Sequence, residues 1–365
     1  MTASIQEATQ AYEAWMRRCT AVRESDLRTK HVEMRADPFV FLRGTYYRWA
    51  QLWPEICAEL RAAPTVLAVG DLHVGSYGTW RDAEGRLAWG VDDFDEAYPL
   101  PYTNDLVRLA TSVKIVTDAG ALSITVRDGC DAIVEGYTAT LARGGKPFVL
   151  AEHFERLETL GLGVVKPGED FWKTFDACRS VGQGVPRDAT RVLSRAMPTP
   201  GMPYRVVRRT AGVGSRGQLR FVAIAECDGG QIAREAKAMV PSASQWLVGG
   251  RSGGGAIYYQ RIIDAAVRSP DPFQRTDGRW LIRRLAPDSN PIDILDLPTE
   301  RDEARLLHAM GAEAANVHLG RPRAARRILA DMRRRKANWL RSAAKRMAKA
   351  VERDLKAYSS VPSAA

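Results

Sequence analysis

The stretch VGDLHVGSYG, residues 69–78, decides the predicted fold, together with VDDFD at residues 91–95. Each acidic cluster follows a short apolar run with the composition of a β-strand, at residues 65–69 and 86–91. A Gly/Asp turn at residues 82–85 lies between the two clusters. The sequence therefore predicts two strand-end loops that direct carboxylates toward one point.

The carboxylates predicted to meet there belong to Asp71, Asp92 and Asp93. Carboxylates held close together repel one another unless a cation or a proton lies between them. Mg²⁺ binding and general-base catalysis are common uses of such a site. A plainer interpretation makes Asp71 a turn former and leaves Asp95 simply exposed. Because His73 lies inside the first cluster, the functional interpretation is favoured for the group as a whole.

The composition is that of a globular protein. The chain has 365 residues, of which 45% are hydrophobic and 26% charged, which is enough for two lobes with a substantial core. We expect no membrane span, because no apolar stretch approaches the roughly 20 residues that a spanning helix needs, and the N-terminus lacks the pattern of a signal peptide. The cysteines are scattered without a CxxC pair, which fits a reducing cytoplasm better than a disulfide framework or a zinc site.

The net charge of +10 is concentrated near the C-terminus. Residues 321–349 are rich in arginine and lysine and contain a single acid, Asp331. Apolar residues recur there at near-helical spacing, so we predict one amphipathic helix with a basic outer face. Such a face could bind nucleic acid, anionic lipid or a polyanionic substrate, or it could simply be solvated.

The chain divides into four predicted parts. Residues 1–185 form a mostly helical lobe that carries the acidic loops, and Asn104 is expected to cap a long helix within it. Residues 186–203 hold several Pro and Gly residues with little periodicity and are predicted to be a linker. Residues 204–298 contain alternating strand patterns and turns, which indicate an antiparallel β lobe. Residues 299–365 are predicted to be helical.

The sequence GVGSRG at residues 212–217 fits the pattern G-x-G-x-x-G, which by itself is a weak signal. In a dinucleotide-binding fold a helix follows this pattern, but here a β-branched and aromatic strand follows at residues 218–225. A glycine loop between two antiparallel strands is instead the lid that protein kinases place over the phosphates of ATP. Lys237, on the next strand, would then hold the α- and β-phosphates. An ordinary hairpin turn with an exposed lysine is the alternative.

Taken together, these motifs resemble the bacterial family called domain of unknown function 2252, a relative of the protein-kinase-like and aminoglycoside-phosphotransferase-like folds. The resemblance is carried by FLRG at residues 41–44, by residues 70–78, 93–96 and 105–110, by the glycine loop and by the Lys237 strand. In ordinary kinases the glycine loop and the lysine precede the catalytic loop, whereas here they follow it. The resemblance therefore implies an α+β, two-lobed, circularly permuted kinase-like fold, with a helical catalytic lobe first, an antiparallel-sheet lobe second and a helical C-terminus. The helix at residues 306–318 resembles the one that normally leads into the catalytic loop.

The resemblance also implies roles for individual residues. Asp71 would orient or deprotonate the acceptor hydroxyl, and Asp93 would bind Mg²⁺ with help from Asp92 or Asp95. Lys237 would hold ATP under a lid that includes Gly212, Gly214, Ser215 and Gly217. His73 matches a histidine of the phosphotransferase version of this loop, where it would either take part in the chemistry or hold the loop by hydrogen bonds.

Ser76 departs from the pattern, because the wider fold places an asparagine there that binds the second metal ion. The serine hydroxyl can still coordinate Mg²⁺, but it is shorter and lacks the amide carbonyl. The acid that would pair with Lys237 is also not evident, although Asp264 and Glu235 are candidates.

The function expected from these motifs is transfer of the γ-phosphoryl group of Mg·ATP to a hydroxyl acceptor, on a small molecule or a protein. One alternative is a nucleotide-binding or nucleic-acid-binding protein with degenerate catalysis. Another is a two-metal phosphoesterase that uses Asp71 and His73. The phosphoesterase interpretation needs further histidines at loop ends and leaves the glycine loop and Lys237 unexplained.

Overall fold

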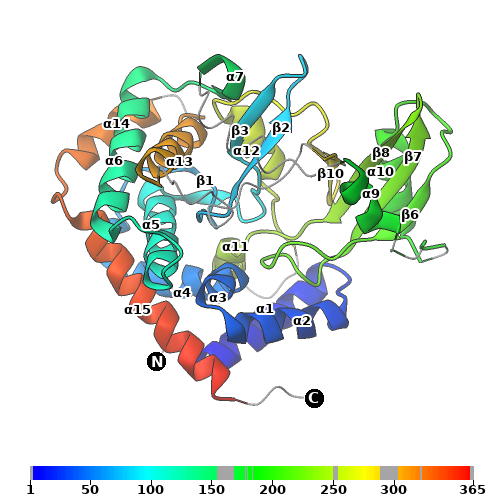
Figure 1. Ribbon diagram of the computed structural model, residues 1–365. Helices are drawn as coiled ribbons and strands as arrows, with labels where there is room; N and C mark the ends of the chain where they lie inside the picture. Colours follow the sequence, from blue (N-terminus) through cyan, green and yellow to red (C-terminus); the bar gives the residue numbers. More distant parts are fainter. Residues whose placement is uncertain are drawn as a thin grey trace.

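Two lobes of different composition make up the protein, one mostly helical and one built on an antiparallel sheet (Figure 1). The computed structural model describes residues 3–153, 168–176, 178, 180–182, 184–249, 254–287, 303–320 and 323–361. The mixed α+β architecture predicted from the sequence is confirmed. Among the described residues, no helix combines the length and the apolarity needed to cross a lipid bilayer.

The N-terminal part is a run of short helices. These are α1 (Ile5–Cys19), α2 (Glu24–Ala36), α3 (Pro38–Gly44) and α4 (Tyr46–Ile56), followed by the 3₁₀ helix η1 (Ala58–Leu60). Ser4 and Glu7 form a capping box at the start of α1, in which each side chain accepts a hydrogen bond from the backbone N–H of the other residue. Asp37 accepts a hydrogen bond from the Val40 N–H at 2.8 Å, and Pro38 follows it at the first position of α3.

The first lobe contains two small antiparallel sheets. Strand β1 (Thr65–Ala68) pairs with β4 (Tyr98–Pro101), while β2 (Tyr77–Arg81) and β3 (Leu87–Val91) form a hairpin that β5 (Phe148–Val149) extends. The predicted strands β1 and β3 are present, but they do not pair with each other. Strand β2, which the sequence patterns did not indicate, lies between them in the chain and turns back into β3 through the predicted turn at residues 82–85.

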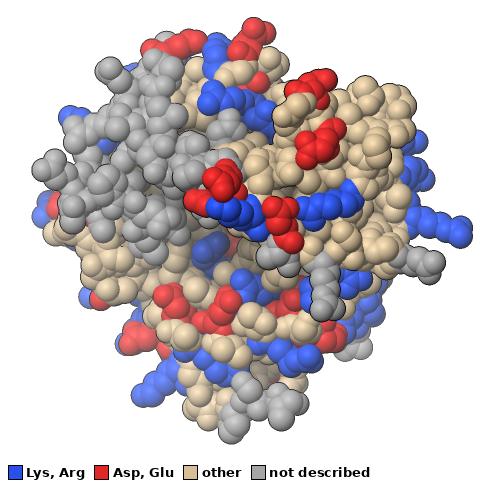
Figure 2. Space-filling model, turned by 45° about the vertical axis from the view of Figure 1, so that its right-hand side comes forward, with Lys and Arg blue, Asp and Glu red and all other residues tan. Residues whose placement is uncertain are grey.

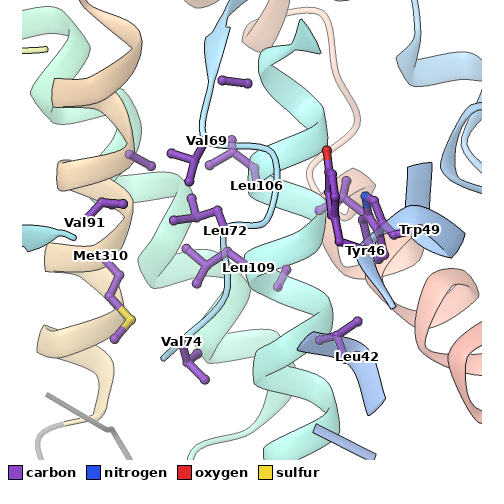
Figure 3. Close-up of a cluster of buried hydrophobic side chains, with 14 of the residues drawn as sticks. Leu42, Tyr46, Trp49, Val69, Leu72, Val74, Val91, Leu106, Leu109 and Met310 are labelled. Atoms are coloured by element: carbon purple, nitrogen blue, oxygen red, sulfur yellow. The ribbon is translucent and has the colours of Figure 1, made fainter. Parts of the chain in front are cut away.

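Helices surround these sheets and provide most of the core. They are α5 (Tyr102–Asp118), α6 (Val126–Arg143), α7 (Leu150–His153), α13 (Glu303–His318), α14 (Ala324–Met332) and α15 (Trp339–Ser359). Figure 3 shows how Val69, Leu72 and Val74 enter this core between α5 and α13. Their contacts include Leu106 and Leu109 of α5 on one side, so the acidic loop is anchored by its apolar residues.

Helices α6 and α13 cross at unusually short range. A Cβ on Gly136 would collide with the carbonyl oxygen of His308, and a Cβ on Gly311 would collide with that of Ile133. Only glycine allows the two backbones to approach this closely. This contact ties the C-terminal helix α13 to the N-terminal lobe, although the sheet lobe separates them in the chain.

The second lobe is a five-stranded antiparallel sheet with the strand order β6-β7-β8-β10-β9. Its strands are β6 (Arg205–Arg208), β7 (Arg220–Cys227), β8 (Gly230–Ala238), β9 (Arg275–Asp277) and β10 (Trp280–Leu285). The glycine loop connects β6 to β7, as predicted, and Lys237 lies on β8. Helices α11 (Ala243–Gly249) and α12 (Tyr259–Ala265) lie between β8 and β9 in the chain.

Two helices cover opposite faces of this sheet. Helix α9 (Gly168–Asp176) places Phe175 against Val222 and Ile224 on one face. Helix α10 (Arg187–Ala196) packs Val192 and Leu193 on the other face, among side chains such as Phe221 and Trp280. The apolar residues of α10 thus lie on one side of the helix.

Three details of the sequence prediction are corrected by the structure. The predicted linker at residues 186–203 contains α10, whose short apolar stripe was hidden among charged residues and flanking prolines. Asn104 does not cap α5, which begins at Tyr102; its side chain accepts a hydrogen bond from Trp49 and donates one to the Gly70 carbonyl. The basic segment is not one helix, because the chain breaks between Met332 and Trp339 into α14 and α15. The predicted boundary at residues 298–299 lies outside the described residues.

Candidate active site between the two lobes

Asp105, fully buried at the start of α5, holds the acidic loop in place. Its carboxylate accepts hydrogen bonds from the backbone N–H groups of Val69 at 2.7 Å and Gly70 at 3.0 Å. Gly70 has φ +82°, and a Cβ there would collide with the Glu96 carbonyl oxygen, so the tight turn requires glycine. Asp105 therefore anchors the structure rather than facing the cleft.

Asp71 follows directly and faces the cleft between the lobes. Its Oδ1 is 2.5 Å from Arg108 Nη2, and its side chain is 17% exposed. Burial raises the pKa of Asp71 above its ordinary value, although the ion pair with Arg108 opposes this effect. Arg108 is fully buried, with its guanidinium over the rings of Tyr46 and Trp49. The oxygen Oδ2 has no hydrogen-bond partner among the described residues and remains available to a ligand.

His73 and Ser76 close the loop through short hydrogen bonds. The Ser76 hydroxyl donates to the Asp71 carbonyl at 3.1 Å and accepts from the His73 N–H at 3.0 Å. His73 Nδ1 accepts from the Gly75 N–H at 3.1 Å. Burial, with Arg43 and Arg108 nearby, lowers the pKa of His73 well below its ordinary value, so the imidazole is neutral. Both side chains therefore hold the shape of the loop, and the Ser76 hydroxyl is already engaged within it.

The second acidic cluster meets Lys237 across the cleft. Lys237 Nζ forms an ion pair with Asp95 and lies 3.8 Å from Asp93 Oδ1. The carboxylate of Asp93 is 57% exposed, and although the cleft partly desolvates it, Lys237 and two arginines hold its pKa below the ordinary value. Asp93 is therefore ionised at neutral pH. By contrast, burial raises the pKa of Asp92 to about 6.

The acid that pairs with Lys237 was not found from the sequence. Asp264 instead accepts a hydrogen bond from Gln260 on the surface. Glu235 lies on the same face of strand β8 as Lys237, but its carboxylate accepts hydrogen bonds from arginines instead. The true partner, Asp95, comes from the other lobe, and only the tertiary structure brings it to β8.

A cluster of arginines around Glu235 was also missed. This buried carboxylate accepts hydrogen bonds from Arg209 at 2.9 Å, Arg220 at 3.4 Å and Arg283 at 2.7 Å. Together the arginines hold the pKa of Glu235 well below its ordinary value, against the effect of burial. Arg220 also donates to the Ser215 hydroxyl at 2.5 Å, so the cluster supports the glycine loop from below. A glutamate at an inward position of a strand was the sequence signal that could have indicated it.

The glycine loop is closed over Asp71. A Cβ placed on Gly214 would lie 3.7 Å from Asp71 Oδ2. Helix α2 and the residues before it hold the loop there: Lys30 Nζ donates to the Gly214 carbonyl at 3.3 Å, and the Arg23 N–H donates to the Gly217 carbonyl at 2.8 Å. Burial lowers the pKa of Lys30 to about 8.

Two cavities open at this junction and bring most of the predicted residues together. The larger, of about 240 Å³, is lined by Asp71, His73, Ser76, Asp92, Asp93, Gly212, Gly214 and Lys237. The smaller, of about 40 Å³, shares Asp71, His73, Asp93 and Gly214 with it and adds Ser215. Gly217 lines neither cavity, because it packs against Leu27 of α2. The space-filling view shows basic side chains inside a hollow of the surface, with acidic ones beside them (Figure 2).

Residues 22–166, which include the acidic loops and Asp105, match the family described as "Uncharacterized protein conserved in bacteria (DUF2252)". Over these residues the chain is similar to that family. The resemblance inferred from the motifs is thereby confirmed over these residues. Comparisons with curated proteins and with solved structures found no match. The glycine loop and Lys237 come after the DUF2252 segment in the chain. In the folded protein they line the same cavity as its acidic loops.

The DUF2252 segment supplies the carboxylates that could hold a metal ion. No group of three or more His, Cys, Asp or Glu side chains in the described part of the chain is arranged as a metal site. Mg²⁺ commonly takes only one or two protein carboxylates and fills its remaining positions with water and substrate phosphates. The ionised and exposed Asp93 fits that requirement, whereas the hydroxyl of Ser76 is committed to the loop.

Proposed function

We propose that this protein is an ATP-dependent phosphotransferase, which moves the γ-phosphoryl group of Mg·ATP to a hydroxyl acceptor on a two-lobed, circularly permuted kinase-like fold. One observation carries the proposal. A carboxylate suited to act as a base, Asp71, lies directly below the tip of a glycine loop, and the lysine of the adjacent strand pairs with the second acidic loop.

The arrangement of the sheet lobe supports this function. A glycine loop joins the first two antiparallel strands, and Lys237 lies on the third, which is how protein kinases place their phosphate-binding loop and lysine. Lys237 is almost completely buried, with its side chain 4% exposed, yet it points to the cleft where Asp93 and Asp95 lie. Such a cation is suited to hold phosphate oxygens.

In the proposed reaction, the acceptor hydroxyl gives its proton to Asp71 Oδ2 while its oxygen forms a bond to the γ-phosphorus. The bond from that phosphorus to the bridging oxygen breaks, and ADP leaves with the bonding electrons. Arg108 fixes the orientation of the Asp71 carboxylate through Oδ1, so that Oδ2 faces the cleft. When bound, Mg²⁺ would neutralise phosphate charge beside Asp93.

The closed glycine loop must lift for this reaction. Gly214 lies so close to Asp71 Oδ2 that an acceptor hydroxyl at this oxygen would displace the tip of the loop. Lifting would break the hydrogen bond between Lys30 and Gly214, which joins a charged donor to a backbone carbonyl. The loop would then close again over the bound phosphates and exclude water.

The phosphoesterase alternative has less support. A two-metal site needs several clustered ligands, and the described residues contain no such group. The Nδ1 atom of His73 accepts a hydrogen bond from the Gly75 N–H, which leaves only Nε2 for a metal.

The proposal is tested by the melting temperature with and without Mg·ATP. A ligand at about 100 times its Kd adds about 2.7 kcal/mol to the free energy of unfolding, so wild type should show a clear upward shift that requires Mg²⁺. Lys237→Met should lose the shift. Lys345→Met, which changes an exposed lysine of α15, is the matched control and should keep it.

Two further variants separate the roles of the acids. Asp71→Ala should bind Mg·ATP nearly as wild type does but transfer no phosphate, because the base acts on the acceptor. Asp93→Ala should weaken Mg·ATP binding itself. No shift at millimolar Mg·ATP, or an equal loss of binding in both variants, would contradict the assignment.

A further inference from the structure

Basic side chains outnumber acidic ones around the larger cavity. The basic ones are Arg43, Arg209, Arg220, Lys237, Arg268, Arg283 and Arg284, and the acidic ones are Asp71, Asp92, Asp93 and Asp271. Several of these cations already have a carboxylate partner. Lys237 pairs with Asp93 and Asp95, and the arginines of the Glu235 cluster share that buried acid.

Arg43, Arg268 and Arg284 are different, because none has a carboxylate partner among the described residues; Arg284 lies on β10 of the sheet side, whereas Arg43 and Arg268 do not. The Arg43 guanidinium lies 5.4 Å from the centre of the Phe39 ring, and that of Arg268 lies 4.3 Å from the centre of the Trp80 ring. Arg268 Nη1 donates to the Val91 carbonyl at 3.1 Å, but its Nη2 is buried without a hydrogen-bond partner. An arginine on an aromatic face keeps its charge and most of its donors free for an anion.

Both side chains are partly buried, so their charges have lost part of their hydration. Glu313, Asp271 and Asp92 act on Arg268 electrostatically without forming an ion pair with it. Burial of a charge is costly unless an opposite charge completes the site. The unpaired Nη2 of Arg268 is a buried donor of the kind that a bound ion or ligand satisfies.

The position of these two arginines decides which substrate they would bind. Both lie on the catalytic-loop side of the cavity: Arg43 acts electrostatically on Asp71 and His73, and Arg268 is bonded to the end of β3, next to Asp92. Lys237 and the Glu235 cluster line the opposite, sheet side, under the glycine loop. The phosphates of the donor belong to the sheet side, so the arginines of the loop side face the acceptor.

We propose that the acceptor is a phosphate monoester that carries a free hydroxyl, and that Arg43 and Arg268 bind its phosphate group while the hydroxyl meets Asp71. This inference rests on the proposed phosphotransfer. A phosphate monoester carries about −1.5 to −2 charges at neutral pH, which matches two guanidinium groups. The planar fork of arginine donates two parallel hydrogen bonds to phosphate oxygens. The same charges disfavour a polycationic acceptor such as an aminoglycoside.

The test uses inorganic phosphate as the probe, on protein saturated with a non-hydrolysable Mg·ATP analogue so that the donor site is filled. The melting temperature is followed in phosphate and in chloride at equal ionic strength. Phosphate should raise it above the chloride value in wild type. Arg43→Leu and Arg268→Leu should each weaken phosphate binding by about tenfold or more, as expected for the loss of one charge-assisted contact.

Two controls accompany these variants. Arg43→Lys keeps the charge without the planar guanidinium and should retain part of the phosphate effect. If Arg43→Leu fails to fold, this variant replaces it in the test. Arg341→Leu, at an exposed arginine of α15, should leave the phosphate effect unchanged. A circular dichroism spectrum and an intact shift with the analogue show that each variant is folded.

The outcomes separate the two proposals. If the analogue shifts the melting temperature but phosphate adds nothing, or if phosphate binds equally well to both leucine variants, the anion site is wrong and any phosphate effect comes from an adventitious ion only. If the analogue itself gives no shift, the phosphotransfer proposal fails, and titration of phosphate alone still decides whether Arg43 and Arg268 bind an anion.

Discussion

Replacing Asp105 with asparagine should destabilise the acidic loop at residues 69–78 and the whole protein with it. Asp105 Oδ2 accepts from the Val69 N–H at 2.7 Å, and Oδ1 accepts from the Gly70 N–H at 3.0 Å. Whichever way an asparagine is turned, its NH₂ group faces one of these two N–H donors. The variant therefore loses one of these backbone hydrogen bonds to a charged acceptor and leaves its donor unsatisfied in a fully buried site. It also disturbs a further contact, since Asn104 Nδ2 donates to Oδ1 at 3.1 Å and His318 Nε2 lies 3.0 Å from Oδ2.

The expected change in the free energy of unfolding follows from the lost backbone hydrogen bond and the unsatisfied backbone donor. A hydrogen bond to a charged group contributes about 1.5–3 kcal/mol, and an unsatisfied buried donor costs about 1–3 kcal/mol. Since the two terms overlap, we expect Asp105→Asn to lower the free energy of unfolding by about 2–5 kcal/mol. That is a large part of the roughly 5–15 kcal/mol that stabilises a typical domain.

Urea denaturation followed by tryptophan fluorescence measures this change, with Asp118→Asn as the matched control. Asp118 is the last residue of the same helix, and its carboxylate is 57% exposed and pairs with Lys114 at 2.7 Å. The control should lose less than about 0.5 kcal/mol. Amide exchange at Val69 and Gly70 should also accelerate in Asp105→Asn. A stability loss no larger than that of the control would refute the argument that Asp105 holds the loop.

Two other carboxylates give further predictions. Burial raises the pKa of Glu313 to about 7 from an ordinary 4.5. The unfolded chain therefore ionises first, and the wild-type free energy of unfolding should fall as the pH rises from about 4.5 to about 7. Glu313→Gln should lack this fall in urea titrations across that range, and equal slopes of the free energy against pH in both proteins would contradict the prediction. Glu235→Gln should lower the free energy of unfolding by about 3–5 kcal/mol, because it leaves buried Arg220 and its two neighbours without their anion. A Glu235→Gln variant with the urea midpoint of wild type would show that the arginines do not depend on this acid.

Local patterns were enough to predict much of the site. The glycine loop, the lysine on the following strand and the acidic residues at the ends of two strands are each defined by a few neighbouring residues. The structure places Gly212 and Gly214 of that loop, the lysine and these acids at one cleft. Glycine is required at Gly70 and Gly217 because both have positive φ and tight neighbours, which is a local property that a motif records.

Other features depend on contacts that no local pattern contains. The short amphipathic stripe of α10 became a helix because the sheet provides an apolar face to cover Val192 and Leu193. Asn104 has the chemistry of a helix cap, yet α5 starts earlier and the side chain instead bridges Trp49 and Gly70. In both cases tertiary packing outweighed local propensity.

By itself, the sequence determined which chemical groups are present and which short segments hold them: a strand-end aspartate, a second acidic loop, a flexible glycine lid and a lysine strand. Only the tertiary structure decided their partners, pairing Lys237 with Asp95, setting Gly214 over Asp71 and leaving Arg43 and Arg268 without a carboxylate. The physical reason is that hydrogen bonding along a strand or turn is local, whereas ion pairing and burial depend on distances through space. Those distances depend on the close contact between α6 and α13 and on the packing of the sheet lobe, which bring segments far apart in the sequence to the same cleft.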